Sequence, residues 1–166
     1  MTTPVSVRPA RPEDAAVIAD VWHRAWGDAH IGYVPEALHE HRRLADFQQR
    51  VAPRLSKTTV AETADGVVGF VVVREDEVEQ IFLAASARGL GVADALLQHA
   101  EGVIAERFAV AWLAVVEGNA RARRFYEKHG WRDRGGFDYP AETRDGTLSV
   151  PCRRYEKPVA RGRQGA

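Results

Sequence analysis

The chain has 166 residues, enough for one compact domain, and its 45% hydrophobic and 28% charged residues are typical of a soluble globular protein. Lysine and arginine together number 23, as do aspartate and glutamate, so the formal net charge is zero. A balanced chain has no overall field that attracts nucleic acid or an acidic membrane, and neither is expected as a partner.

The only cysteine is Cys152, so no internal disulfide can form. The N-terminal segment lacks the basic stretch and the apolar core of a signal peptide. The apolar runs 67–73 and 108–116 are far shorter than the roughly 18 residues of a membrane helix. We therefore expect a cytoplasmic protein, with one domain over 5–158 and a disordered tail over 159–166.

The N-terminal half begins with an extended segment at 5–8 and continues into a helix predicted from Pro12 to about Asp28. Proline is tolerated in the first turn of a helix, and the acidic residues that follow it suit the positive end of the helix dipole. A second helix is predicted from 35 to about 49, where the loose spacing of the apolar residues defines its limits poorly.

From residue 58 onward the pattern changes to that of strands. Segments 58–63, 67–74 and 78–84 are joined by short turns, which predicts an antiparallel meander. A helix predicted from Gly89 to about Arg107 leads to a strand at 110–116, and this strand–helix–strand order predicts a locally parallel pair.

The C-terminal third is predicted to hold one helix and two strands. The helix spans 119–129, with Asn119 as its cap and Gly130 as its stop. Strands at 131–139 and 150–157 close the chain. The whole order, β-α-α-β-β-β-α-β-α-β-β, predicts an α/β fold with a mixed central sheet and helices on both faces.

The most informative stretch is 78–93, an apolar strand followed by a short loop and a glycine-containing helix start. Gly89 and Gly91 let the backbone approach a ligand closely, and the first turn of a helix presents unpaired N–H groups and a positive dipole end. With Arg88 at its edge, the segment predicts a cradle for a diphosphate. The alternative is a loop that merely caps the helix.

Two other nucleotide sites are excluded. A dinucleotide fingerprint needs glycine or alanine three residues after its second glycine, where this chain has Asp94. The Gly-x-x-x-x-Gly-Lys motif of a P-loop is absent from the sequence.

The pattern Arg88-x-x-Gly91-x-Ala93 resembles the acyl-CoA signature of the GNAT superfamily of N-acetyltransferases, Gln/Arg-x-x-Gly-x-Gly/Ala. Segment 119–131, with asparagine at its start and Phe-Tyr before glycine and tryptophan, is similar to the second signature of that family. The resemblance covers roughly 5–158 and implies the family's acyl-CoA N-acyltransferase fold. The chain departs from the family in lacking the common proline at 84–87 and in carrying an acid at Asp94.

The resemblance implies that acetyl-CoA is held mainly by backbone groups, which hydrogen-bond the pantetheine arm like a further strand and hold the diphosphate. Tyr126 would lie beside the thioester sulfur, and Glu79 stands where relatives often carry a carboxylate base that acts through water. The residues implied to bind the cofactor are Phe82, Leu83, Ala84, Arg88, Gly89, Leu90, Gly91, Val92, Ala93 and Asn119.

The implied reaction is transfer of an acetyl group from acetyl-CoA to a primary amine by direct attack on the thioester, without a metal. A carboxylate can take the amine proton, and a phenol can supply one to the leaving thiolate. The alternative is a non-catalytic acyl-CoA-binding or sensing domain on the same fold. The acceptor stays open among small molecules and peptide or protein amines, as do the acyl-chain preference and the oligomeric state, a homodimer included.

Single residues have alternative interpretations. Tyr126 can be a core aromatic, Glu79 an ion-paired strand residue, and Asn119 a simple helix cap. The arginines in the 121–124 segment can meet the 3′-phosphate of the cofactor or be solvated.

His39 and His41 do not share a helix face, which argues against a metal site. An acceptor site between the first two helices is predicted from Trp22, Trp26, His30 and Tyr33, with core packing favoured for Trp22.

Overall fold

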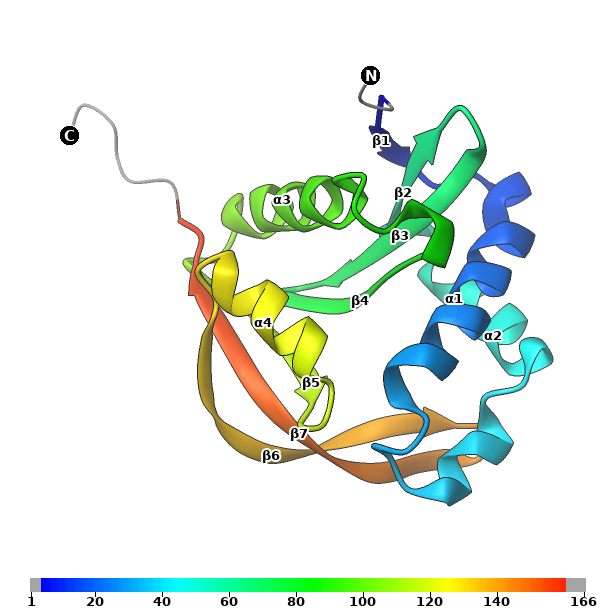
Figure 1. The fold of residues 1–166 in the computed structure, drawn as a ribbon, viewed down its shortest axis with the longest axis vertical. Helices are drawn as coiled ribbons and strands as arrows, with labels where there is room; N and C mark the ends of the chain where they lie inside the picture. Colours follow the sequence, from blue (N-terminus) through cyan, green and yellow to red (C-terminus); the bar gives the residue numbers. More distant parts are fainter. Residues whose placement is uncertain (1–3, 161–166) are drawn as a thin grey trace.

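Seven strands form one sheet in the order β1-β2-β3-β4-β5-β7-β6 in a computed structural model that describes residues 4–160 (Figure 1). The strands are β1 (Ser6–Pro9), β2 (Thr58–Thr63), β3 (Gly66–Arg74), β4 (Glu77–Leu83), β5 (Val110–Val116), β6 (Arg132–Thr143) and β7 (Gly146–Pro158). The α-helices are α1 (Ala15–His30), α2 (Leu44–Val51), α3 (Val92–Ala105) and α4 (Ala120–Lys128). Short 3-10 helices are η1 (Pro12–Asp14), η2 (Glu36–His41), η3 (Ala52–Lys57) and η4 (Ala85–Ala87).

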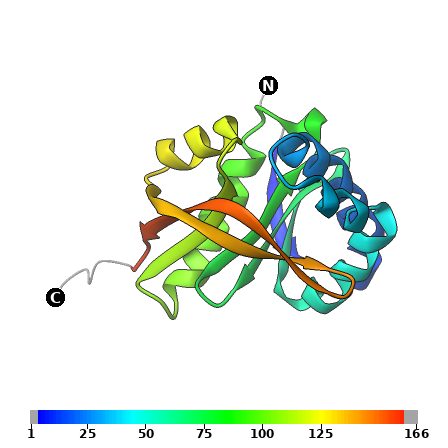
Figure 2. The ribbon, with the colours of Figure 1, turned by 90° about the horizontal axis from the view of Figure 1, so that it is seen from below.

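The sheet separates two layers of helices (Figures 1 and 2). Alternate side chains of β3 show the reason: Val71 packs in the cluster that contains α3 and α4, whereas Phe70 and Val72 pack in the cluster that contains α1 and α2. The mixed α/β fold with helices on both faces is therefore confirmed. None of the helices in the described part is long and apolar enough to cross a membrane.

The predicted meander and parallel pair are also confirmed. Strands β2, β3 and β4 pair antiparallel, and β4 and β5 pair parallel. The parallel pair is joined in register at only one position, Glu77 with Trp112, and the N–H of Trp112 donates to the carbonyl oxygen of Asp76 at 3.0 Å. Beyond this point the two strands diverge, so the edge of β4 that faces β5 is left without a strand partner.

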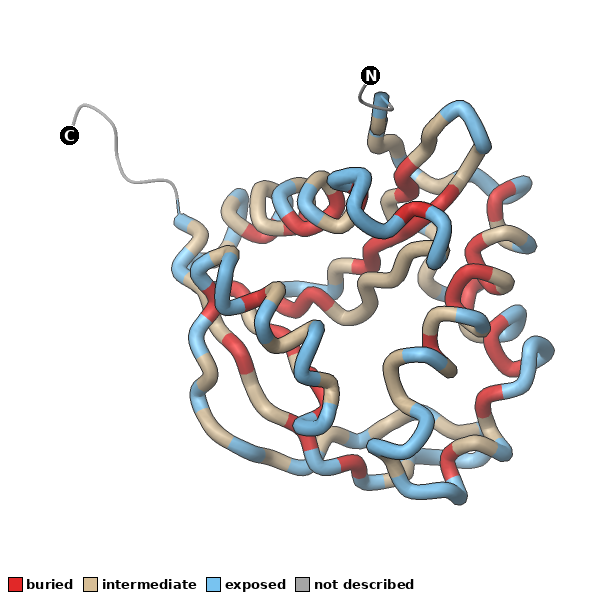
Figure 3. Tube along the Cα trace, in the orientation of Figure 1, coloured by how far each residue is buried: buried red, intermediate tan, exposed pale blue. Residues whose placement is uncertain are grey.

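The closing strands are longer than the sequence predicts, because residues 140–149 continue the hairpin instead of forming a loop. The turn lies at Arg144 and Asp145. Strand β5 pairs with β7 only from Cys152 onward, so the outer part of the β6–β7 hairpin pairs only with itself and reaches toward α2 (Figures 1 and 2). Along β6, exposed and half-buried residues alternate (Figure 3).

Two helix predictions need correction. The helix predicted from 35 to 49 is broken between η2 and α2, because Arg43 is extended and its N–H donates to the Asp46 carboxylate at 2.8 Å, which starts a new helix. The helix predicted from Gly89 begins only at Val92, because Gly89 and Gly91 adopt left-handed φ values of 79° and 80°.

The C-terminal segment leaves the sheet after β7. The N–H groups of Val159 and Ala160 donate to the carbonyl oxygen of Ala109, at 2.9 and 3.2 Å. The rest of the predicted tail, 161–166, lies outside the described residues.

Candidate active site between the splayed strands

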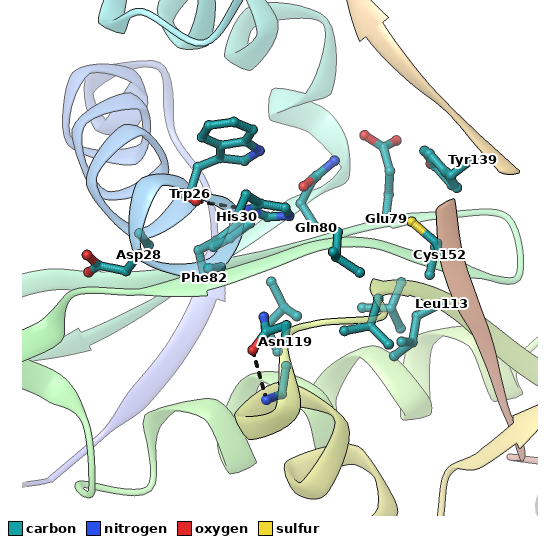
Figure 4. A pocket seen from close by; sticks show the side chains of 18 of the residues that line it. Trp26, Asp28, His30, Glu79, Gln80, Phe82, Leu113, Asn119, Tyr139 and Cys152 are labelled. Carbon is teal, nitrogen blue, oxygen red and sulfur yellow. Dashed lines mark hydrogen bonds between the residues drawn. The ribbon is translucent and has the colours of Figure 1, made fainter. Parts of the chain in front are cut away.

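A cavity of about 890 Å³ fills the gap between β4 and β5. Its walls come from both layers and both halves of the sheet: β4 and β5 form the floor, α1 and η2 one side, the starts of α3 and α4 the other (Figure 4). The outer part of the β6–β7 hairpin contributes Tyr139 and Glu142 at the far end. One open strand edge, one glycine-rich helix start and one polar end therefore meet in a single space.

The start of α3 is shaped to receive an anion. The first helical hydrogen bond runs from the N–H of Ala95 to the carbonyl oxygen of Gly91 at 3.1 Å, so the N–H groups of Val92, Ala93 and Asp94 have no partner within the helix. A Cβ placed on Gly91 or Gly89 would meet no atom within 4 Å, which shows that the space over this backbone is open. The cradle predicted from the sequence thus fits a diphosphate in shape and polarity.

Eight of the ten residues implied to bind the cofactor line the cavity, and two do not. Ala84 lies outside it, its N–H donates to Val68 and its carbonyl oxygen accepts from Ala87, so these backbone groups serve the fold. Leu90 also lies outside, with its side chain exposed. The eight that line the cavity are Phe82, Leu83, Arg88, Gly89, Gly91, Val92, Ala93 and Asn119.

Two charged side chains at the cradle are paired with neighbours. The exposed Arg88 guanidinium lies 3.4 Å from the carboxylate of Asp28 on α1, a contact that solvent weakens. The carboxylate of Asp94 lies 3.0 Å from Nε2 of His129 at the end of α4. Asp94 is therefore engaged across the two helices beside the cradle.

Asn119 caps α4, as the sequence predicts. Its Oδ1 accepts a hydrogen bond from the N–H of Ala122 at 3.2 Å (Figure 4). Because the capping bond uses only the oxygen, the side-chain amide nitrogen keeps both of its donors, and Asn119 lines the cavity as well. Capping and ligand contact are thus compatible in one side chain.

Tyr126 lies in the core between α3, α4 and the sheet, yet it also lines the cavity. Within residues 4–160, no side chain or backbone group pairs with its hydroxyl. Burial raises the pKa of this phenol well above its usual value near 10. The hydroxyl therefore keeps its proton and is available to donate a hydrogen bond to a ligand.

Glu79 is both a cavity residue and an ion-paired one. Its side chain is only 4% exposed, and its two oxygens face Arg54 at 2.5 Å and Arg74 at 3.5 Å. Figure 4 shows its carboxylate at the end of the cavity near Tyr139. Glu79 is therefore an ion-paired strand residue, as one interpretation of the sequence has it, and it also lines the cavity.

The aromatic residues of α1 divide between core and cavity. Trp22 is 1% exposed and packs against Phe47 and Phe70, as favoured from the sequence, whereas Trp26 and His30 line the cavity. The His30 ring stacks on Trp26, and its Nδ1 lies 3.0 Å from the Trp26 carbonyl oxygen (Figure 4).

This packing determines the protonation state and the tautomer of the His30 ring. Burial lowers its pKa to about 4, so the ring is neutral at pH 7. Because only an N–H can pair with a carbonyl, the proton sits on Nδ1 and Nε2 carries a lone pair.

Several cavity residues were missed by sequence reasoning. Sequence distance hides them, because they come from the end of η2, from α2, η3, β3 and β4 and from the outer hairpin, and they meet only in the fold. The missed charged and hydroxyl residues are Arg42, Arg50, Arg54, Arg74, Glu77, Tyr139 and Glu142. Among the arginines considered from the sequence, Arg121 lines the cavity, whereas Arg123 donates to Tyr155 and pairs with Asp133.

The cysteine also lines the cavity. Cys152 is buried, and burial raises the pKa of its thiol to about 11. At pH 7 the group is a protonated thiol, which is a poor nucleophile.

Comparisons with known proteins agree with this geometry. The family model described as acetyltransferase (GNAT) family matches residues 18–131. The peptidyl-lysine N-acetyltransferase YjaB of Escherichia coli (strain K12) is 26% identical over 131 residues, 79% of this chain and 84% of the relative.

Solved structures share the fold. A GCN5-related N-acetyltransferase from Rhodopseudomonas palustris has a TM-score of 0.75 at 20% identity, covering 95% of this chain and 98% of that one. PaiA N-acetyltransferase from Thermoplasma acidophilum, solved in complex with coenzyme A, has a TM-score of 0.68 at 16% identity, covering 93% and 99%. Since the family model spans well over half of the sequence, the chain belongs to the GNAT family of acetyltransferases.

Proposed function

We propose that this acyltransferase moves an acetyl group from acetyl-CoA to a primary amine by direct attack on the thioester. The observation that carries the proposal is the shared cavity, which is lined by β4 along its open edge, by the cradle residues Gly89, Gly91, Val92 and Ala93, and by Tyr126. The coenzyme A complex of PaiA and the peptidyl-lysine activity named for YjaB support both halves of the reaction.

Acetyl-CoA supplies the activated acetyl thioester, and the chain supplies positioning and proton transfer. The N–H groups of Val92 and Ala93 hold the diphosphate of acetyl-CoA. The unpaired backbone edge at Phe82 and Leu83 pairs with its pantetheine arm. A splayed strand N–H can also stabilise the oxyanion that forms on attack. Direct transfer is favoured over an acyl-enzyme, because the Cys152 thiol is protonated at neutral pH.

The acceptor amine must lose a proton before it attacks, since a free alkylamine has a pKa near about 10. We infer that Glu79 receives this proton, directly or through water. Arg54 and Arg74 pair with its carboxylate and hold it in place. Glu77, which accepts a hydrogen bond from Tyr139 at 2.8 Å, is the neighbouring carboxylate in the same end of the cavity.

The variant Glu79→Gln is expected to lose rate most at pH values where the amine is protonated, with partial recovery at higher pH. Removing one partner of a buried ion pair also costs stability, on the order of 3 kcal/mol. The measurement is a pH profile of kcat/KM together with a thermal unfolding curve.

A matched control is Glu62→Gln. Glu62 is a strand carboxylate paired with Arg8 at 2.6 Å, on β2 and outside the cavity. Its loss should affect stability without changing the shape of the pH profile. If Glu79→Gln and wild type have profiles of the same shape, the base is another group or water alone.

Acetyl-CoA is expected to stabilise the protein against unfolding. A ligand at about 100 times its dissociation constant adds roughly 2.7 kcal/mol to the free energy of unfolding. Calorimetric titration gives the affinity, and thiol release with a panel of amines gives turnover. Absence of binding at millimolar acetyl-CoA would contradict the proposal, whereas binding without turnover of any amine would favour the non-catalytic acyl-CoA-binding domain.

A further inference from the structure

The end of the cavity away from the cradle is rich in arginine. Four arginines line it, and three of them are matched by three glutamates that line it too. The matched contacts are Arg50 with Glu142 at 2.8 Å, Arg54 with Glu79 at 2.5 Å and Glu142 at 3.1 Å, and Arg74 with Glu77 at 3.3 Å and Glu79 at 3.5 Å. The fourth, Arg42, leaves this end with one surplus positive charge.

Arg42 is buried and has no ion-pair partner among residues 4–160. Only 7% of the residue is exposed, and Nε is buried without a hydrogen bond. Nη1 donates to the carbonyl oxygen of His41 at 2.9 Å, and the guanidinium lies 5.7 Å from the centre of the Trp26 ring. Burial lowers the pKa of Arg42 to about 10, which still leaves it charged at pH 7. Burial of a charge without a counter-ion is energetically unfavourable. The presence of such a charge at Arg42 therefore points to an anionic ligand that pairs with it.

The local fold holds Arg42 in this place. It occupies the break between η2 and α2, where its backbone leaves the helical conformation with φ −130°. On one side Leu38 anchors η2 in the core, and on the other Asp46 starts α2. A continuous helix, as predicted from the sequence, would not have this break, which is what brings the Arg42 side chain to the cavity wall.

The same end of the cavity is covered by the outer β6–β7 hairpin. Arg144 at the hairpin turn pairs with Asp46 of α2 at 2.7 Å, and Glu142 pairs with Arg50 and Arg54. These contacts enclose the acceptor end, which suits a small molecule better than a lysine on a folded protein.

We propose that the acceptor is a small amine that carries a carboxylate, of the free amino acid type, and that this carboxylate pairs with Arg42. The inference rests on the proposed acetyl transfer and names its substrate class. One surplus arginine matches one negative charge, whereas a dianion such as a phosphate monoester would leave the three glutamates facing excess negative charge. The planar guanidinium also suits the planar carboxylate.

The first experiment compares kcat/KM for glycine, L-leucine and L-phenylalanine with that for the α-amide of each. Wild type should prefer the acid by at least about tenfold, although the less basic amine of the amide is more often neutral and reactive. Arg42→Gln should lose this preference while its affinity for acetyl-CoA stays unchanged. The control Arg24→Gln, whose side chain is 78% exposed on α1, should keep the preference.

Direct binding separates this inference from the proposed function. In calorimetric titrations with coenzyme A present, the amino acids should bind to wild type and bind at least about tenfold more weakly to Arg42→Gln. If no amine is turned over but this Arg42-dependent binding is found, acetyl transfer is wrong and the carboxylate site stands. Equal use of acids and amides by wild type would overturn the carboxylate site and leave acetyl transfer intact.

Stability of the ligand-free protein gives a third readout. Because Arg42 has no carboxylate partner among the described residues, Arg42→Met should unfold at the same temperature as wild type or above it. A structural arginine would behave in the opposite way, so a lowered unfolding temperature would overturn the assignment of Arg42 to a ligand. Arg42→Lys, which keeps the charge but not the planar fork, should retain part of the preference for acids.

Discussion

Replacement of Gly91 with valine is expected to lower the affinity for acetyl-CoA about a hundredfold while the protein stays folded. At φ 80° a β-branched residue is strained by about 1–2 kcal/mol, so the loop should leave the conformation that aims the N–H groups of Val92 and Ala93 into the cavity. Losing two charge-assisted hydrogen bonds of about 1.5 kcal/mol each gives this factor. Calorimetric titration of both proteins with acetyl-CoA measures the effect.

A second glycine separates backbone strain from cofactor binding. Gly66, the first residue of β3, has φ 95°, and a Cβ there also meets no atom within 4 Å, but the residue does not line the cavity. Gly66→Val should therefore cost similar stability and leave acetyl-CoA affinity unchanged. Unchanged affinity in Gly91→Val would place the diphosphate elsewhere on the protein.

The glycine loop before α3 and the asparagine cap of α4 could be predicted from the sequence because local residues encode them. Left-handed glycines, a helix start and an asparagine cap depend on short-range geometry, and the segment around Gly91 and the Asn119 cap carry these features in sequence order. The same locality explains why strands β2 and β5 have the predicted bounds. Ala84, which caps η4, lies outside the cavity, and its backbone groups are already paired.

The acceptor half could not be predicted in this way. Its charges come from segments far apart in the chain. A sequence does not show that Arg54 will meet Glu79 while Arg42 meets no carboxylate within the part of the chain that the structure describes. Two local features near this end of the cavity also differ from the prediction, namely the helix break before α2 and the length of the β6–β7 hairpin. The break before α2 depends on one capping carboxylate, and the long hairpin runs through Pro140 and Pro151, which disfavour strands in general.

Proline is tolerated in this hairpin because its outer part pairs on one side only. Strand β6 is the edge of the sheet, and among the described strands β7 pairs only with β6 over residues 146–151, so both strands can carry residues that cannot donate on their free side. The outer part of the β6–β7 hairpin is instead held at its end by ion pairs, Glu142 with Arg50 and Arg144 with Asp46. These ion pairs also hold the hairpin over the arginine-rich end of the cavity.

Replacement of Tyr126 with phenylalanine is expected to lower kcat by between about tenfold and a hundredfold with little change in acetyl-CoA affinity. Because burial raises the pKa of Tyr126 above that of the leaving thiolate, about 8.5, complete proton transfer to the thiolate is uphill. The hydroxyl would then act as a hydrogen-bond donor to the developing charge. A hydrogen bond to a charged group contributes about 1.5–3 kcal/mol, which corresponds to this range of rates.

Tyr155→Phe is the matched control, because its ring lies 6.2 Å from that of Tyr126 and its hydroxyl is already used. That hydroxyl donates to Glu127 at 2.6 Å and accepts from Arg123 at 3.1 Å, so its removal should lower the free energy of unfolding and leave kcat largely intact. Tyr126→Phe should do the reverse, since no protein group pairs with its hydroxyl in the described part of the chain. Full turnover by Tyr126→Phe at saturating acceptor would show that Tyr126 serves only the core.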